Sequence, residues 1–120
     1  MPIYDTFELG NSSLTATNAN LGQNNSSTQL KVPSLYRMKY SNIEYTNLDT
    51  ASGTLTLSKI GAAGTIAIRV KALPGMGTNG ATVVDSGDES AIYVESGYYL
   101  VAKISNGAGS ITGTAEFVPE

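Results

Sequence analysis

The feature that most constrains the fold is a series of short segments in which apolar residues occupy every second position. The clearest segment is residues 65–72, where one set of alternate positions is entirely apolar: Ile66, Ile68, Val70 and Ala72. Successive side chains of a β-strand point to opposite faces, so a period of two predicts strands with one face on a core. No segment sustains the apolar spacing of three and four that an amphipathic helix needs.

The same alternation recurs along the chain, and turn-forming residues separate its occurrences. Segments with this pattern cover residues 3–9, 35–40, 43–46, 54–60, 65–72, 81–85, 91–95, 98–105 and 110–118. Pairs such as Ser52-Gly53, Asn79-Gly80 and Asn106-Gly107 lie between them and favour tight turns. About eight short antiparallel strands at this spacing predict an all-β fold, a β-sandwich of the jelly-roll or Ig-like kind, with a small barrel as the alternative.

Residues 10–29 differ from the rest because they carry no charge and few apolar side chains; we call them the uncharged arm. Such a segment alone cannot bury enough apolar surface to offset the entropy lost on ordering. Either its own sheet or a neighbouring chain must hold it. We therefore divide the chain into an N-terminal strand with an extended arm (1–30) and a β-sandwich domain (31–120). Within the arm we expect partner contacts at Leu14, Leu21, Asn24 and Asn25.

Composition argues against several classes of function. The 120 residues include no cysteine and no histidine, which removes disulfides, thiolate chemistry and the commonest general base and zinc ligand. We therefore expect no enzymatic activity, no cofactor and no metal. The net charge is −3 and the seven basic residues are scattered, so we expect no nucleic-acid partner. Arg69 and Lys71, like Arg37 and Lys39, are predicted to lie on solvated strand faces.

The sequence also predicts no membrane segment, because no stretch approaches the ~20 apolar residues of a spanning helix. The first residues, Met1 to Asp5, lack the basic start and apolar run of a signal peptide. We accordingly expect a protein that is made and remains soluble in a cytoplasm-like compartment.

The acidic turn Asp85-Ser86-Gly87-Asp88-Glu89 is the densest group of carboxylates. Its spacing does not match an EF-hand calcium loop, so a solvated turn is the preferred interpretation. Paired carboxylates can also hydrolyse glycosides, but only when a cleft holds them about 5–10 Å apart. One short turn is not such a cleft, and we reject that interpretation.

Two further features suggest contact with a partner. The chain has seven tyrosines, a residue type enriched at interfaces and in sugar sites, and Tyr98-Tyr99 places one ring on each side of its strand. Tyr99 is therefore the candidate for an outward contact. Residues 73–80 form a charge-free loop with one methionine, Met76, which could serve as an adaptable contact tip or could be part of an ordinary inter-strand loop.

The C-terminal third resembles a known kind of protein. An apolar strand at Tyr93-Val94, a Gly97-Tyr98 entry into the next strand, an Asn106-Gly107 turn and a last strand at 111–118 are similar to the ending of small β-sandwich proteins of tailed-bacteriophage particles. The lack of cysteine and the abundance of Gly, Ser, Thr and Asn fit the same group. No family binding residue can be carried over, because the resemblance contains no invariant motif.

This resemblance implies a capsid decoration (cement) protein. Such a protein binds the outside of the shell in the virion after synthesis in the host cytoplasm. Its expected partners are the major capsid protein and neighbouring copies of itself, with a trimer as the favoured homo-oligomer. The alternative is a carbohydrate- or receptor-binding module of a phage fibre or tail. A small hydrolase would lack a plausible nucleophile–base pair, since only rare Ser–Lys chemistry remains without histidine.

Overall fold

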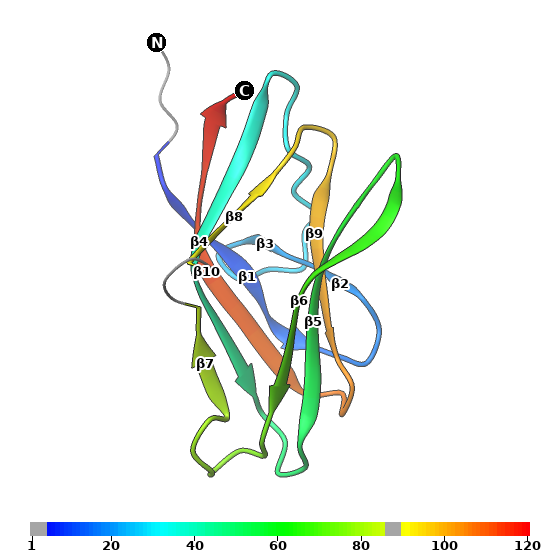
Figure 1. Cartoon of the computed structure of the whole chain (residues 1–120), viewed down its shortest axis with the longest axis vertical. Helices are drawn as coiled ribbons and strands as arrows, with labels where there is room; N and C mark the ends of the chain where they lie inside the picture. The colour runs from blue at the N-terminus through cyan, green and yellow to red at the C-terminus, as the bar shows by residue number, and fades with distance from the viewer. Residues whose placement is uncertain (1–4, 86–89) are drawn as a thin grey trace.

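The computed structural model describes residues 5–85 and 90–120, and within them two antiparallel β-sheets pack face to face (Figure 1). The larger sheet has the order β3–β1–β10–β4–β7, and β8 also pairs with β4. Its strands are β1 (Phe7–Leu14), β3 (Gly22–Gln23), β4 (Tyr36–Asn47), β7 (Thr82–Val84), β8 (Ala91–Val94) and β10 (Gly109–Pro119). The smaller sheet, ordered β2–β9–β5–β6, contains β2 (Ala19–Asn20), β5 (Gly53–Gly61), β6 (Gly64–Leu73) and β9 (Tyr99–Ile104). The predicted all-β sandwich is confirmed.

The uncharged arm belongs to the sandwich itself. The strand predicted at residues 3–9 instead begins at Phe7 and continues to Leu14, while residues 1–4 lie outside the described part of the chain. Strand β1 lies between β3 and β10 in the larger sheet, whereas β2 pairs with β9 in the smaller sheet. The segment therefore crosses from one sheet to the other and back. Of the two alternatives left open by the sequence, its own sheets hold it.

A few well-placed residues are enough to hold this polar segment. Its leucines Leu14 and Leu21 are only 2% and 1% exposed and lie in the core. The buried Asn11 side chain donates a hydrogen bond to the Asn20 carbonyl oxygen (2.9 Å) and accepts one from the Ser13 amide (2.8 Å). A β-carbon at Gly10 would lie 2.1 Å from the Ile111 carbonyl oxygen, so only glycine fits there. Close backbone packing and satisfied polar groups thus replace the missing apolar side chains.

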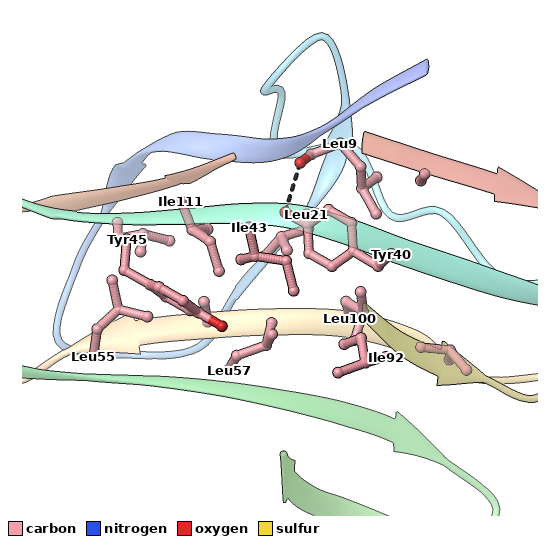
Figure 2. Packing of buried hydrophobic residues seen from close by; sticks show 14 of the residues in the cluster. Leu9, Leu21, Tyr40, Ile43, Tyr45, Leu55, Leu57, Ile92, Leu100 and Ile111 are labelled. Carbon is pink, nitrogen blue, oxygen red and sulfur yellow. Dashed lines mark hydrogen bonds between the residues drawn. The ribbon is translucent and has the colours of Figure 1, made fainter. Parts of the chain in front are cut away.

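The core lies between the sheets, and the long strand β4 contributes its largest side chains (Figure 2). Tyr40, Ile43 and Tyr45 are fully buried, although 40 and 43 are three residues apart. Asn42 has a positive φ of 53°, and the pairing of β4 with β10 shifts register between Thr112 and Thr114. This irregularity moves the alternation by one position, so both halves of β4 face the core. The segments expected at residues 35–40 and 43–46 are therefore parts of one strand that this irregularity interrupts.

A second register shift corrects the prediction for β6. Leu57 pairs with Arg69 but Ser58 pairs with Ala67, so the ladder skips Ile68. Residues directly opposite each other share a face of the sheet, and Leu57 is fully buried. Arg69, and Lys71 opposite buried Leu55, therefore face the interior, while Val70 on the other side is 63% exposed. The prediction that these two cations lie on a solvated face is wrong.

Candidate functional site

The two cations of β6 meet a buried carboxylate, and this group is the first candidate site; we call it the Asp85 cluster. Asp85 directly follows β7, and its side chain is 0% exposed. Lys71 Nζ lies 2.7 Å from Asp85 Oδ1, and Arg69 Nε lies 3.6 Å from Oδ2. The Tyr45 hydroxyl donates a 2.5 Å hydrogen bond to the same Oδ2. The cluster joins β4 and β7 of the larger sheet to β6 of the smaller one.

Tyr45 reaches this position because β4 directs its ring from the larger sheet into the core, toward the smaller sheet (Figure 2). Burial raises the pKa of the Tyr45 hydroxyl well above its ordinary value, and the hydrogen bond to the Asp85 carboxylate raises it further. The hydroxyl is therefore a neutral donor under all physiological conditions. The two carboxyl oxygens of Asp85 thus have different partners: Lys71 lies at Oδ1, and Tyr45 and Arg69 lie at Oδ2.

The second candidate site is the end of the sandwich at the bottom of Figure 1, where three connections meet: residues 48–52, 74–81 and 105–108. We call these three connections the loop end. Asn47, at the end of β4, is fully buried among them. Its Nδ2 donates to the carbonyl oxygens of Ala51 (2.9 Å) and Pro74 (3.0 Å), and its Oδ1 accepts from the Asp49 amide (2.9 Å). One amide side chain thus ties two of the connections together.

Asn106 ties in the third connection. Its Nδ2 donates to Asn47 Oδ1 and to the Ala51 carbonyl oxygen, both at 2.9 Å. The Met76 amide donates a 2.7 Å hydrogen bond to the Asp49 carbonyl oxygen. A β-carbon at Gly75 would lie 1.9 Å from the Thr50 carbonyl oxygen, so the backbones approach as closely as glycine permits. Hydrogen bonds therefore hold the three connections of the loop end together as one preorganised unit.

This rigid base presents apolar side chains to solvent. Met76 is 51% exposed and Leu48 is 43% exposed, and the Met76–Asp49 hydrogen bond brings their connections together. A hollow of about 390 Å³ lies at the same end of the sandwich, lined in part by Ser52, Pro74 and Ser105, one from each connection. Loops at one end of a β-sandwich are a common place for binding, because the sheets fix them in position.

A third region lies on the outer face of the larger sheet, near the end of the chain. Tyr93 is 50% exposed, and the Arg37 guanidinium lies over its ring at 4.7 Å. These two residues line a hollow of about 300 Å³ together with Glu95 and Glu120. Lys59 forms a 2.7 Å ion pair with Glu95 and lies over the Tyr98 ring at 5.2 Å. This hollow combines one aromatic face with charged hydrogen-bonding groups.

The structure separates the six residues that the sequence suggested as partner contacts. Leu14 and Leu21 lie in the chain's own core, so their side chains offer no surface to a partner in this conformation. Asn25 accepts a 2.8 Å hydrogen bond from the Thr112 hydroxyl, and Asn24 is exposed at the adjacent turn position. Both asparagines have positive φ, 58° for Asn24 and 60° for Asn25, which Asn tolerates better than most residues.

Of the other two suggested contacts, Tyr99 is half-buried on β9, and Met76 is well exposed. The structure brings Met76 near Leu48, which the sequence reasoning did not single out. It also missed Tyr93, Asn47 and the interior pairing of Asp85. A leucine directly after a strand, before Asp49-Thr50, was the available signal for Leu48. No local signal distinguishes Asn47 from the chain's other asparagines, because its partners come from distant segments.

The prediction of a solvated acidic turn is wrong for Asp85, whose side chain is buried against Lys71 and Arg69. The rest of that turn lies outside the described residues, which stop at Asp85 and resume at Ser90. Among residues 5–85 and 90–120 no group of three or more candidate ligands is arranged to hold a metal ion. The same part of the chain contains no helix that is long and apolar enough to cross a membrane. A scan of protein-family models finds none that matches the sequence, and a search of curated proteins finds no match either.

Proposed function

We propose that this chain is a non-enzymatic structural protein that attaches to the outside of a bacteriophage capsid and stabilises it, with the loop end as the attachment surface. The observation that carries the proposal is the pair of exposed apolar side chains, Met76 and Leu48, on a base that Asn47 and Asn106 make rigid. The resemblance of the C-terminal strands to phage decoration proteins supplies the choice of partner.

The physical case for attachment rests on preorganisation. A binding surface that is already ordered loses little conformational entropy when it docks, so more of the contact energy appears as affinity. Methionine packs against varied surfaces, which suits a protein that meets chemically similar but not identical sites on a shell. The hollow at the loop end provides room for a protruding residue of the partner.

Stabilisation of the shell follows from linkage. A protein that binds only the assembled lattice lowers the free energy of that state relative to dissociated subunits. Each copy would need an interface of ~1,200–2,000 Å² in total to remain bound. Two loop-end side chains cannot supply that area alone, so contacts with neighbouring copies, a trimer in the favoured arrangement, would complete it.

The test is particle binding. Purified protein is mixed with capsids stripped of accessory proteins, and occupancy and the melting temperature of the shell are measured. We expect saturable binding and a higher melting temperature, and both should fall for a Leu48→Ser/Met76→Ser double variant. Val70→Ser is the matched control, because Val70 is equally apolar and 63% exposed but lies on β6, away from the loop end. If neither the wild type nor Val70→Ser binds to the particles, the proposal is contradicted.

A second candidate function has a specific observation in its favour. The hollow around Tyr93 offers an exposed ring with Arg37, Glu95 and Glu120, a combination that suits a sugar or a receptor side chain. We propose a carbohydrate- or receptor-binding module of a phage fibre or tail as this alternative. A glycan array with wild type and Tyr93→Ala decides it: glycans bound by the wild type and lost by the variant support the module, and an array without signal rejects a glycan ligand.

A further inference from the structure

We propose that Lys71 and Asp85 are a modification site, at which the chain forms an amide bond between its two sheets with loss of one water molecule. The inference is independent of what the protein attaches to. Its basis is the geometry of the Asp85 cluster, where an amine and a carboxyl group from different sheets touch inside the sandwich.

The contact differs from an ordinary ion pair of the same length. Lys59 Nζ and Glu95 Oε1 lie 2.7 Å apart and form a hydrogen bond, and the Glu95 side chain is 48% exposed. Lys71 Nζ and Asp85 Oδ1 are also 2.7 Å apart, yet among the described residues Oδ1 accepts no aligned hydrogen bond. The Asp85 side chain is 0% exposed, and that of Lys71 is 19% exposed. The nitrogen is therefore held against a carboxyl group that bulk water does not reach.

The two carboxyl oxygens of Asp85 have partners that suit different roles in the reaction. Oδ2 accepts the Tyr45 hydrogen bond at 2.5 Å and has the Arg69 guanidinium 3.6 Å away. A donor and a cation in these positions would stabilise negative charge on Oδ2 when Cγ becomes tetrahedral. Oδ1 faces Lys71 instead, so it is the oxygen positioned to receive a proton and depart.

The reaction balances without any further reagent. One proton passes from Lys71 Nζ to Asp85 Oδ1, which yields a free amine and a carboxylic acid and leaves the pair with no net charge. The Nζ lone pair then attacks Cγ, and the C–O bond to Oδ1 breaks as a second proton moves from Nζ to that oxygen. One N–C bond forms, one C–O bond breaks, and water leaves. Fixed proximity replaces the activation that an amide bond otherwise requires.

The position of the bond gives it a structural consequence. Arg69 and Lys71 lie on β6, which is the last strand of the smaller sheet, and Asp85 follows β7, which is the last strand of the larger sheet. An amide there would join the outer strands of the two sheets. Its effect on the unfolded chain would resemble that of a disulfide, in a protein with no cysteine.

The experiment is intact-mass spectrometry of the full chain, purified after expression and again after prolonged incubation below the melting temperature. We expect a mass lower by one water molecule, and trypsin should fail to cleave after Lys71, which leaves a dehydrated peptide spanning residues 70–103. Lys71→Arg retains the cation but lacks a nucleophilic amine, so it should keep its full mass. Asp85→Ala should keep its full mass as well.

Two results would overturn the inference. One is a wild-type chain at full mass, with normal tryptic cleavage after Lys71, at both times. The other is loss of water that persists in Lys71→Arg, because this would indicate a succinimide formed by Asp85 with its own backbone. Hydroxylamine cleaves a succinimide but leaves a side-chain amide intact, so treatment of the wild type distinguishes the two products directly.

Discussion

The two buried polar clusters of this protein, around Asn47 and around Asp85, achieve burial in different ways. Asn47 is neutral, and both ends of its amide have backbone partners in the loop end. Asp85 is a carboxylate unless the proposed amide has formed, and its partners are the side chains of Tyr45, Arg69 and Lys71. Neutral hydrogen bonds stabilise a group without a large desolvation penalty, whereas buried charges depend on every partner being present. Asn47 therefore organises loops, and Asp85 connects sheets.

Asp85→Ala should destabilise the protein most. It leaves Arg69 and Lys71 facing the interior without the carboxylate, and loss of one member of a buried charge cluster costs ~3–5 kcal/mol. The free energy of unfolding, measured by urea titration, should fall by that amount. Glu44→Ala is the control, because Glu44 is exposed and pairs with Val84 beside the cluster. An Asp85→Ala variant as stable as the control would show that the cluster does not join the sheets.

Asn47→Ala should have the next largest effect. It removes the donor and acceptor that the loop-end carbonyl and amide groups use, and buried groups left unpaired cost ~1–3 kcal/mol. We expect a loss of about 2–3 kcal/mol in the free energy of unfolding, with faster amide hydrogen exchange at Asp49 and Met76. Asn106→Ala, at a less buried position, should cost less than half as much. Equal losses for the two variants would assign no special role to Asn47.

Tyr45→Phe tests the hydrogen bond to Asp85 separately from the charges, because it removes one hydrogen-bond donor and leaves the ion pairs in place. A hydrogen bond to a charged group contributes ~1.5–3 kcal/mol, and we expect a loss near the lower limit since Lys71 and Arg69 remain. Tyr40→Phe is the neutral counterpart, as the Tyr40 hydroxyl donates to the Leu9 carbonyl oxygen at 2.7 Å. Its loss should be about 1 kcal/mol. The reverse order in thermal unfolding would contradict a charged acceptor at Tyr45.

The smallest effect is expected at the Lys59–Glu95 pair, because the Glu95 side chain is 48% exposed. Its hydrogen bond from Lys59 lowers the pKa of Glu95 below the ordinary value of 4.5. The pair therefore stabilises the folded state at pH values above 4.5, and this contribution disappears as the pH falls through the lowered pKa. Because solvent reaches the Glu95 carboxylate and screens its charge, Glu95→Gln should cost under ~0.5 kcal/mol at pH 7 and less in high salt. A larger, salt-independent loss would contradict this assignment.

Sequence periodicity was sufficient to predict the fold class, but it did not predict which face of each strand points to the interior. The alternation in residues 65–72 predicted a strand correctly, yet one skipped residue at Ile68 directs Arg69 and Lys71 inward. A bulge of this kind depends on the partner strand, so no local pattern reports it. The same limit applies to the candidate site. Met76 could be suggested from its charge-free loop, but its proximity to Leu48 depends on hydrogen bonds between segments far apart in the chain.

The all-β fold was predictable from the sequence alone, because a period of two between frequent turn residues allows only β-strands to bury one apolar face. The sequence also limited the available chemistry, since no histidine or cysteine occurs among the 120 residues. The position of the uncharged arm, the inward direction of Arg69 and Lys71 and the joining of three loops into one rigid end were visible only in the folded structure. Those outcomes depend on pairing between distant strands, and pairing energy is a property of the assembled sheets rather than of any segment.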